Sequence, residues 1–179
     1  MIAEETINKL LRDIISVIIN QPEFTVIRGK QNGAPRPTGS YADVNFLFDD
    51  GIGWEERKVE NEGDDDVKLT AEGYRLITMS LGFYRDGSTD FARKVRTALV
   101  RESIVFLMNQ AKVGLIDRTE VRDISEPLEN GFEQRAQFDV VLSAVGTDEE
   151  IVKAINSLDI VAELHQRNVK TTQTIEVRP

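Results

Sequence analysis

Arginine side chains held at fixed points of the chain are the groups in this sequence best suited to specific chemistry. The guanidinium group forms rigid, bidentate pairs with carboxylates, and the chain offers 31 Asp and Glu residues against 22 Lys and Arg. Such pairs can be scattered surface ion pairs that contribute little to stability, or they can join one subunit to the next. We predict an interface that contains Pro35, Arg36, Pro37, Tyr41, Tyr84, Arg85, Asp86, Arg93, Arg96, Arg122 and Arg135.

Arg36 is the most constrained of these residues because it lies between two prolines within the turn-rich segment 29–40. Proline has no amide hydrogen to donate, so this segment cannot lie inside a sheet and must run over a surface. A plain connecting loop would satisfy the same pattern. A stiff Pro-X-Pro sequence would, however, also hold Arg36 outward at a contact.

The residue patterns of known catalytic sites are missing from the chain. The single histidine, His165, lies in a polar stretch, no serine has the surroundings of a nucleophile elbow, and no glycine-rich phosphate loop is present. There is no cysteine, which excludes disulfides, thiolate nucleophiles and cysteine metal sites. Carboxylates are abundant, but nothing in the sequence places two across a cleft. We predict no enzymatic activity and no cofactor, with a small acidic enzyme or metal-binding module as the less favoured alternative.

The acidic run at residues 60–66, ENEGDDD, is the segment that a metal ion could use. It lacks the Asp-x-Asp-x-Asp-Gly order and the downstream glutamate of a calcium loop. Like charges repel each other and offer no apolar surface to bury, so the run is typical of a solvated loop tip. We therefore predict no metal site there.

The formal net charge of -9 restricts the classes of partner. Nucleic-acid groove binders and membrane-surface proteins usually need a basic face, which this composition argues against. An acidic surface is compatible with DNA that passes without binding. The acidic N-terminus does not resemble a secretory signal, and no apolar run approaches the roughly 18 residues of a membrane span. The chain is expected to fold in a reducing cytoplasm, which leaves later assembly into a particle open.

The segment 73–108 is expected to organise the fold. Residues 74–84 alternate as a strand does, with Ile77, Met79, Leu81 and Phe83 on the core side and a Thr, Ser and Tyr side facing solvent or a partner. Residues 85–87 form a turn, and Ser88 would cap a helix with Asp90 in its first turn. The buried stripe of that helix contains Phe91, Val95, Ala98 and Leu99.

The other elements follow from periodicity and turn residues. A helix over 4–19 has an apolar stripe of Ile7, Leu10, Leu11, Ile14, Val17 and Ile18, which Ile15 and Ile19 widen. It lies on a sheet or, in part, packs against a neighbouring subunit. The remaining predictions are strands at 24–28 and 41–48, a turn at 49–51, an antiparallel return strand at 54–60, a strand at 115–124, a loop at 127–131 and a long strand at 132–145, one face of which carries Phe132, Gln134, Ala136, Phe138, Val140 and Leu142.

The C-terminal part is ambiguous. Residues 148–164 begin with helical spacing after Thr147 and Glu150, yet they alternate as a strand does in their second half. Residues 171–177 are rich in strand-forming types. The prediction is one α+β domain over residues 1–165, with a mainly antiparallel mixed sheet and about three helices, followed by a C-terminal strand or extended tail at 166–179.

Several ordered motifs resemble the neck or tail terminator proteins of contractile-tailed bacteriophages. They are Ala34-Pro35-Arg36-Pro37-x-Gly39-x-Tyr41, Phe83-Tyr84-Arg85-Asp86-Gly87, Phe91-Ala92-x-x-Val95-Arg96, Val121-Arg122-Asp123-Ile124 and Glu133-Gln134-Arg135-Ala136-Gln137-Phe138-Asp139-Val140. The resemblance covers roughly residues 1–165. The helical pattern at 148–156 departs from it, and the tail after Leu164 has no counterpart.

The resemblance implies a structural virion protein of the phage neck, assembled in the host cytoplasm. Copies of the chain would form a ring, with six the implied number, that caps the tail tube and ends its polymerisation. The tail tube protein, the sheath and the head-completion or connector proteins would be its partners. DNA would pass through the lumen without sequence-specific binding, and no membrane is involved. Another head–tail connector or a tail tube component is the alternative.

Overall fold

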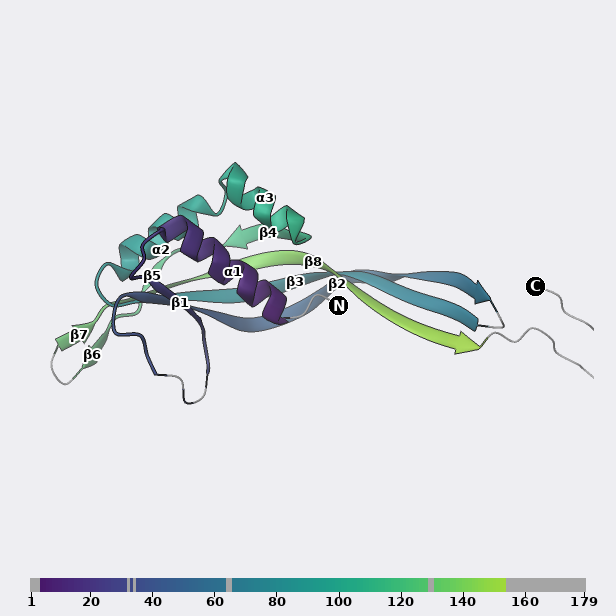
Figure 1. Cartoon of the computed structure of the whole chain (residues 1–179), viewed down its shortest axis with the longest axis horizontal. Helices are drawn as coiled ribbons and strands as arrows, with labels where there is room; N and C mark the ends of the chain where they lie inside the picture. Colours follow the sequence, from purple (N-terminus) through teal and green to yellow (C-terminus); the bar gives the residue numbers. More distant parts are fainter. Residues whose placement is uncertain (1–3, 32, 34, 64–65, 129–130, 154–179) are drawn as a thin grey trace, which may run out of the picture. The chain divides into compact units, whose positions relative to one another are not determined.

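The computed structural model describes residues 4–153 apart from 32, 34, 64–65 and 129–130 (Figure 1). His165 and the predictions for 154–164, 166–179 and 171–177 lie outside this part. The elements are α1 (Glu4–Ile19), β1 (Thr25–Arg28), β2 (Tyr41–Gly63), β3 (Asp66–Tyr84), α2 (Ser88–Ala98), α3 (Glu102–Gln110), β4 (Val113–Arg118), β5 (Arg122–Asp123), β6 (Glu126–Leu128), β7 (Gly131–Glu133) and β8 (Arg135–Lys153).

The main sheet has six strands in the order β1-β2-β3-β8-β4, with β5 also paired to β8. β1 is parallel to β2, whereas β4 and β5 are antiparallel to β8. β6 and β7 form a separate hairpin. With three helices in the described residues and a mostly antiparallel mixed sheet, the α+β prediction is confirmed.

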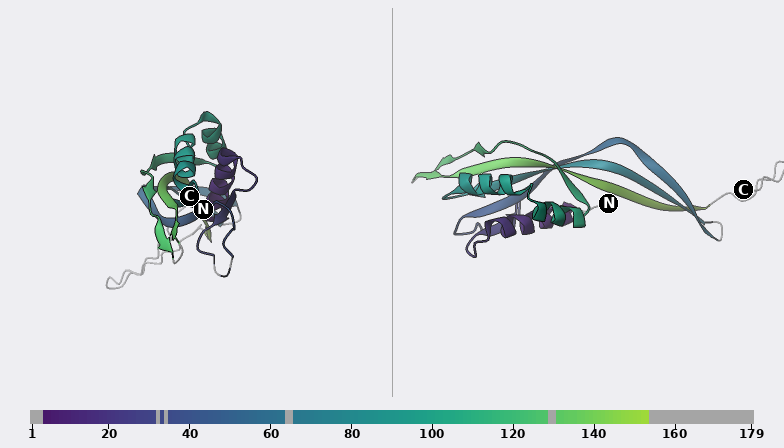
Figure 2. Two further views of the ribbon diagram at one scale, coloured as in Figure 1. Left: turned by 90° about the vertical axis from the view of Figure 1, so that its left-hand side faces the viewer. Right: turned by 90° about the horizontal axis from the view of Figure 1, so that it is seen from above.

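The chain divides into two units. The body contains the described residues of Met1–Glu55 and Gly73–Thr147, and the second unit contains the described residues of Glu56–Glu72 and Asp148–Pro179. The buried hydrophobic core belongs to the body, in which α1, α2 and α3 cover one face of the sheet (Figures 1 and 2). None of the described helices is long and apolar enough to cross a membrane.

α1 has the bounds that its sequence pattern predicts. Ile7, Leu11, Ile14, Ile15 and Ile19 are all buried within one copy of the chain, so this stripe needs no neighbouring subunit to cover it. The prediction that Val17 belongs to the buried stripe of α1 is wrong, because its side chain is 61% exposed. Its position follows the helical period less closely than Ile15 and Ile19, which take the buried places.

β3 carries the predicted core face, with Met79, Leu81 and Phe83 buried. The opposite face was expected to meet solvent or a partner, yet Thr78 and Ser80 are buried within one copy of the chain. Gln137 of β8 helps to enclose Ser80, since its Nε2 donates to Ser80 Oγ at 2.7 Å. This helix-free face of the body sheet is polar yet partly enclosed.

β2 overturns two predictions. The expected turn at 49–51 and the return strand at 54–60 are instead parts of one strand that runs from Tyr41 to Gly63. Part of the expected acidic loop tip at 60–66 also lies in this strand and in β3. Gly51 of the expected turn does not have a positive φ, whereas Gly53, two residues later, has a left-handed backbone with φ 74° and marks an irregular point within the strand. Pairing with β3 outweighs the local turn preference of Asp-Asp-Gly.

The predicted capping role of Ser88 is wrong. Ser88 is the first helical residue, and the cap position belongs to Gly87, whose φ is 78°. A Cβ on Gly87 would lie 3.3 Å from the Phe91 ring, so both backbone and space favour glycine. α2 ends at Ala98, and Arg101 precedes α3 in an extended conformation. No glycine or proline marks this break.

The C-terminal half contains three further corrections. Residues 115–124 form two strands, β4 and β5, and the predicted loop at 127–131 contributes to the hairpin β6–β7. Phe132 lies on that hairpin with 77% of its surface exposed, whereas Ala136, Phe138, Val140 and Leu142 of β8 are buried as predicted. The segment after Thr147, for which the sequence leaves helix or strand open, is a strand as far as Lys153, because β8 continues to that residue.

Candidate functional site

Three segments distant in sequence meet where β2 begins, β3 ends and β8 begins. They are the proline loop (residues 29–40), the β3–α2 turn (residues 85–87) and the hairpin β6–β7 with the adjoining Gln134. Ser40 Oγ donates to the Asp86 carbonyl at 3.1 Å. The Arg85 N–H donates to the Gln134 carbonyl at 2.7 Å, and the Gly87 N–H donates to the Gln134 side chain at 3.2 Å. These bonds join the three segments into one surface.

An aromatic–arginine cluster, made of Tyr41, Tyr84, Arg85 and Arg135, forms the centre of this surface. The two tyrosine rings stack with centroids 4.5 Å apart and planes 7° from parallel. The Arg85 guanidinium lies 5.9 Å from the Tyr41 centroid, and the Arg135 guanidinium lies 5.8 Å from the Tyr84 centroid. Each cation–π contact contributes on the order of 0.5–1 kcal/mol at an exposed site. The cluster therefore holds two arginines in fixed positions.

Asp43 lies beneath the cluster on the helix-free face of the sheet. Tyr84 Oη donates to Asp43 Oδ2 at 3.2 Å, and Asp43 Oδ1 is buried. Burial raises the pKa of the Asp43 carboxyl, and burial together with the Asp43 charge raises the pKa of Tyr84. Gly82 leaves the space that Asp43 needs, because a Cβ there would lie 2.3 Å from Asp43 Oδ1.

Glu133 anchors the basic side of the cluster. Arg135 donates to it through Nε at 2.7 Å and through Nη2, and Arg135 also pairs with Glu126 at 2.6 Å. Arg36 lies 3.7 Å from the same Glu133 carboxylate, and the Arg36 side chain is 66% exposed. Arg36 is therefore placed at the rim of the cluster with most of its surface open to solvent.

The cluster borders two small cavities that share Lys30, Asp43 and Tyr84. One, of about 240 Å³, extends under Pro35 and Arg36, and the other, of about 290 Å³, extends to Ser80, Gly82 and Gln137. The Asp43–Tyr84 pair could hold or pass a proton. Within the described ranges, no three His, Asp or Glu side chains come together as a metal site. The arrangement is best suited to binding a surface of complementary charge.

Three of the predicted arginines lie away from the cluster. Arg96 Nε donates to the Thr119 carbonyl at 2.6 Å, which ties α2 to the chain after β4. Arg93 forms only a long contact of 3.8 Å with Asp90, one helical turn away. Arg122 pairs with Asp139 at 2.7 Å across the β5–β8 ladder. The structure thus gives Arg96 and Arg122 contacts within the chain.

The remaining eight predicted residues belong to the three joined segments or to the strand ends beside them: Pro35, Arg36, Pro37, Tyr41, Tyr84, Arg85, Asp86 and Arg135. Their role at an interface stays a prediction. Sequence reasoning missed Asp43, Gly82 and Glu133. A glycine inside a strand is a known sign of close approach, so Gly82 near the end of β3 could have been found. Glu133 had no such sign among so many acids.

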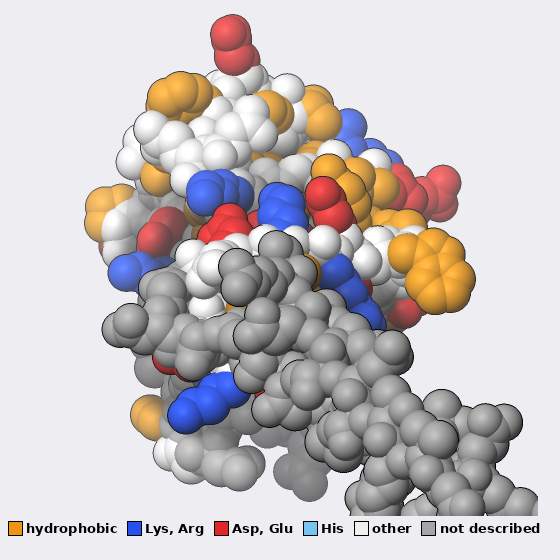
Figure 3. Space-filling model, turned by 90° about the vertical axis from the view of Figure 1, so that its right-hand side faces the viewer, with side chains coloured by type: hydrophobic (Ala, Val, Ile, Leu, Met, Phe, Trp, Pro, Cys, Tyr) orange, Lys and Arg blue, Asp and Glu red, His pale blue; other side chains and the backbone are white. Residues whose placement is uncertain are grey.

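Figure 3 shows Lys and Arg side chains directly beside Asp and Glu side chains on the face that it draws. The ion pairs agree with this mixing: Arg75 pairs with Asp49 at 2.8 Å, and Arg28 pairs with Glu4 and Glu5 at 2.9 and 2.8 Å. Pairing within the chain therefore uses several arginines that the sequence offers for pairing between copies. Arg36 differs from them in its exposure and in the length of its contact.

Comparison with curated protein sequences finds no match. A family model described as phage neck terminator protein matches residues 5–167, which include the body from its fifth residue onward and the ordered motifs around the cluster. The chain belongs to the phage neck terminator protein family.

Proposed function

We propose that this protein assembles into a ring in the phage neck, caps the tail tube, ends its polymerisation and joins the tail to the head-completion proteins. The match of the neck terminator family to residues 5–167 carries this proposal, because that family is one of structural phage neck proteins. Six copies is the number that the sequence resemblance implies. A contractile tail, with a sheath anchored outside the ring, is part of the same proposal.

The exposed rim of the aromatic–arginine cluster supports a role in contact between copies or with the tube. A ring needs two different patches on each subunit that fit each other. Arg36 offers a guanidinium with open donors, and Phe132 on the neighbouring hairpin is 77% exposed. Phenylalanine and arginine are both enriched at protein–protein interfaces relative to the rest of the surface. The partner patch would be acidic, which a chain with a net charge of -9 can supply.

The charge also bears on DNA passage. A ring of acidic subunits would repel phosphates and let DNA slide through its lumen, since phosphate binding depends on Lys and Arg contacts. The protein would thus be a virion component that touches DNA only in passing. Its binding partners would be other copies of the chain, the tail tube, the sheath and the head-completion proteins.

Arg36→Glu tests the proposal. Reversing this charge should lower ring formation or tube capping about tenfold or more, because like charges would face each other at the contact. Light scattering measures ring formation, and electron microscopy of tubes assembled with the protein measures the fraction of capped ends.

Arg101→Glu is the matched control, since it makes the same change in net charge on an exposed residue that precedes α3. Both variants should keep a melting temperature within about 2 °C of the wild type, as expected for surface charges. If Arg36→Glu lowers the melting temperature as far as it lowers assembly, Arg36 serves the fold. A wild-type protein that neither forms rings nor binds tube ends would contradict the proposed function itself.

A further inference from the structure

The outer edge of β2 is open along most of the body. β1 pairs with β2 only from Tyr41 to Val44, and no other described strand lies on that side of β2. The Val44 carbonyl points to this side, where it accepts the Gly29 N–H at 3.0 Å. Since backbone direction alternates along a strand, the N–H and C=O groups of Phe46 and Phe48 point to the same side. An unpaired edge of this kind is a template for another strand.

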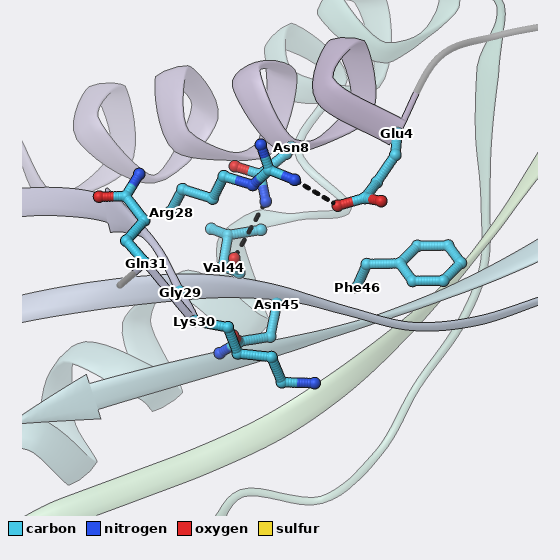
Figure 4. Close-up of a pocket in the computed structure, with 9 residues that line it drawn as sticks. All are labelled: Glu4, Asn8, Arg28, Gly29, Lys30, Gln31, Val44, Asn45 and Phe46. Carbon is cyan, nitrogen blue, oxygen red and sulfur yellow. Dashed lines mark hydrogen bonds and ion pairs between the residues drawn. The ribbon is translucent and has the colours of Figure 1, made fainter. Parts of the chain in front are cut away.

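A hollow lies beside this edge at the point where β1 ends (Figure 4). It has a volume of about 510 Å³ and is lined by residues of α1, of the chain after β1 and of β2. Asn8 of α1 is only 1% exposed, and its Nδ2 donates to the Val44 carbonyl at 3.0 Å. Within the described chain its Oδ1 is buried with no hydrogen-bond partner. A buried acceptor without a donor is costly, so a hydrogen-bond donor that entered the hollow would stabilise this site.

The side chains along the β2 edge indicate what kind of segment could bind there. Phe46 packs against the core on the helix-covered face, and Phe48 follows on that face with 58% of its surface exposed. The opposite face begins with Asn45. Residues 45–55 carry three carboxylates, of which Asp49 already pairs with Arg75, and they carry no basic side chain. The occupant should therefore be an extended segment with one apolar face and a positive charge.

The C-terminal segment of the chain meets these requirements. In residues 171–177 the apolar Ile175 and Val177 alternate with Thr174 and Glu176. Residues 165–179 contain three basic side chains, Arg167, Lys170 and Arg178, against the single acid Glu176. A segment as long as 154–179 can extend up to roughly 85 Å, enough to reach a neighbouring subunit.

We propose that the edge of β2 at residues 45–50 takes the segment 171–177 of a neighbouring copy as an added β-strand. This inference rests on the proposed ring, because it needs a second copy of the chain. Backbone hydrogen bonds supply the binding, and the fit of Ile175 and Val177 to the phenylalanine face supplies the register. Each subunit would thereby hold the next through its own tail.

Disulfide trapping tests the proposal in the full-length protein, which has no cysteine of its own. Two variants, Phe48→Cys and Ile175→Cys, are mixed under mild oxidation, and the linked heterodimer is measured on non-reducing gels and by mass spectrometry. The Cα atoms of a disulfide lie within about 7 Å, so only a close contact links efficiently. We expect this pair to link at least about tenfold faster than Ser103→Cys with Ile175→Cys, a control on an exposed residue of α3.

Each other outcome has a defined meaning. Faster linking of Phe48→Cys to itself would show that β2 pairs with a second β2, which overturns the proposal. A third variant carries both Phe48→Cys and Ile175→Cys in one chain. If this variant forms a link within its own chain while the mixed single variants form none, the role of the neighbouring copy is overturned. Rings seen by electron microscopy without the expected link would overturn the strand contact alone. Links without rings would contradict the proposed ring and retain the contact between copies.

Proline substitutions separate strand pairing from side-chain docking. Gln173→Pro and Thr174→Pro, each combined with Ile175→Cys, remove N–H groups that point to opposite sides of an extended segment. One of the two should slow linking to Phe48→Cys about fivefold, the effect of one lost hydrogen bond. Thr174→Ala should leave the rate unchanged. If both proline variants link to Phe48→Cys as fast as Thr174→Ala does, an added strand is contradicted.

Discussion

In the body, β2, β3 and β8 present a buried face to three helices, whereas almost all described side chains of these strands in the second unit are exposed or half-buried. Thr70 is the one buried side chain among the described residues of the second unit. Ion pairs connect its strands: Lys58 with Glu72 at 3.0 Å, and Lys68 with Glu149 at 3.1 Å. Apolar burial stabilises by about 25 cal/mol per Å², and exposed ion pairs contribute little. The body therefore holds most of the stability.

The largest effect should come from the core of the body. Phe138→Ala removes a fully buried ring that stacks 6.0 Å from Phe83 between centroids, and it should lower the free energy of unfolding by about 3–5 kcal/mol. Ile151→Ala in the second unit, where the side chain is 67% exposed, should change it by less than about 0.5 kcal/mol. Urea unfolding measures both. Similar losses in the two variants would remove the distinction between the units.

A close approach on the helix-free face should give the next largest effect. Gly82→Ala places a Cβ 2.3 Å from Asp43 Oδ1 and should lower the free energy of unfolding by about 1–3 kcal/mol. Gly51→Ala is the matched control, since no atom lies within 4 Å of its Cβ position. Thermal unfolding compares the two. An unchanged melting temperature for Gly82→Ala would show that Asp43 moves aside without loss.

Asp43→Asn should stabilise the body at pH 7. Burial raises the pKa of the Asp43 carboxyl in the folded state, so its contribution to stability is complete at low pH and is lost as the pH rises through that raised pKa. Asparagine does not ionise, and its carbonyl can still accept the Tyr84 hydroxyl. The variant should melt at a higher temperature than the wild type at pH 7, and the gap should close below about pH 4. If the difference in melting temperature between the variant and the wild type widens at low pH, the pKa of Asp43 is not raised in the folded state and this explanation is excluded.

The smallest effect should come from an ion pair of the second unit. In a double-mutant cycle, Lys68→Ala and Glu149→Ala should show a coupling of about 0.2–1 kcal/mol, because both side chains are partly exposed. The coupling should shrink as salt increases. A salt-independent coupling would mean that the second unit excludes water more than its exposure indicates.

The burial of one face, more than the unit to which a residue belongs, explains which elements could be predicted from the sequence. Where one face is buried, as on α1, β3 and β8 of the body, the apolar period gave the element and its core side. Where no face is buried, local signals decided wrongly: Asp-Asp-Gly suggested a turn in β2, and Thr147 with Glu150 suggested a helix in β8. Backbone pairing with a distant strand overrides such signals, and it leaves no pattern in the sequence of one strand.

Only part of the aromatic–arginine cluster could be predicted from the sequence. Arg36 and the tyrosines were recognised by type and by their place in stiff or turning segments. The stacking of Tyr41 on Tyr84 depends on strand order, which periodicity does not report. Arg96 and Arg122 were grouped with them because an arginine that ties one element to another looks the same in sequence as one that faces outward.

The parallel pairing of β1 with β2 turns the proline loop into a return path. Thr25 lies opposite Tyr41 and Arg28 lies opposite Val44, so the chain leaves the far end of β1 and must travel back along its whole length before β2 begins. A tight hairpin is geometrically impossible here, and parallel neighbours need a connection of about a dozen residues. Relatives that shorten this stretch would have to give up β1, whereas those that lengthen it could change what the neck presents to its surroundings and leave the sheet intact.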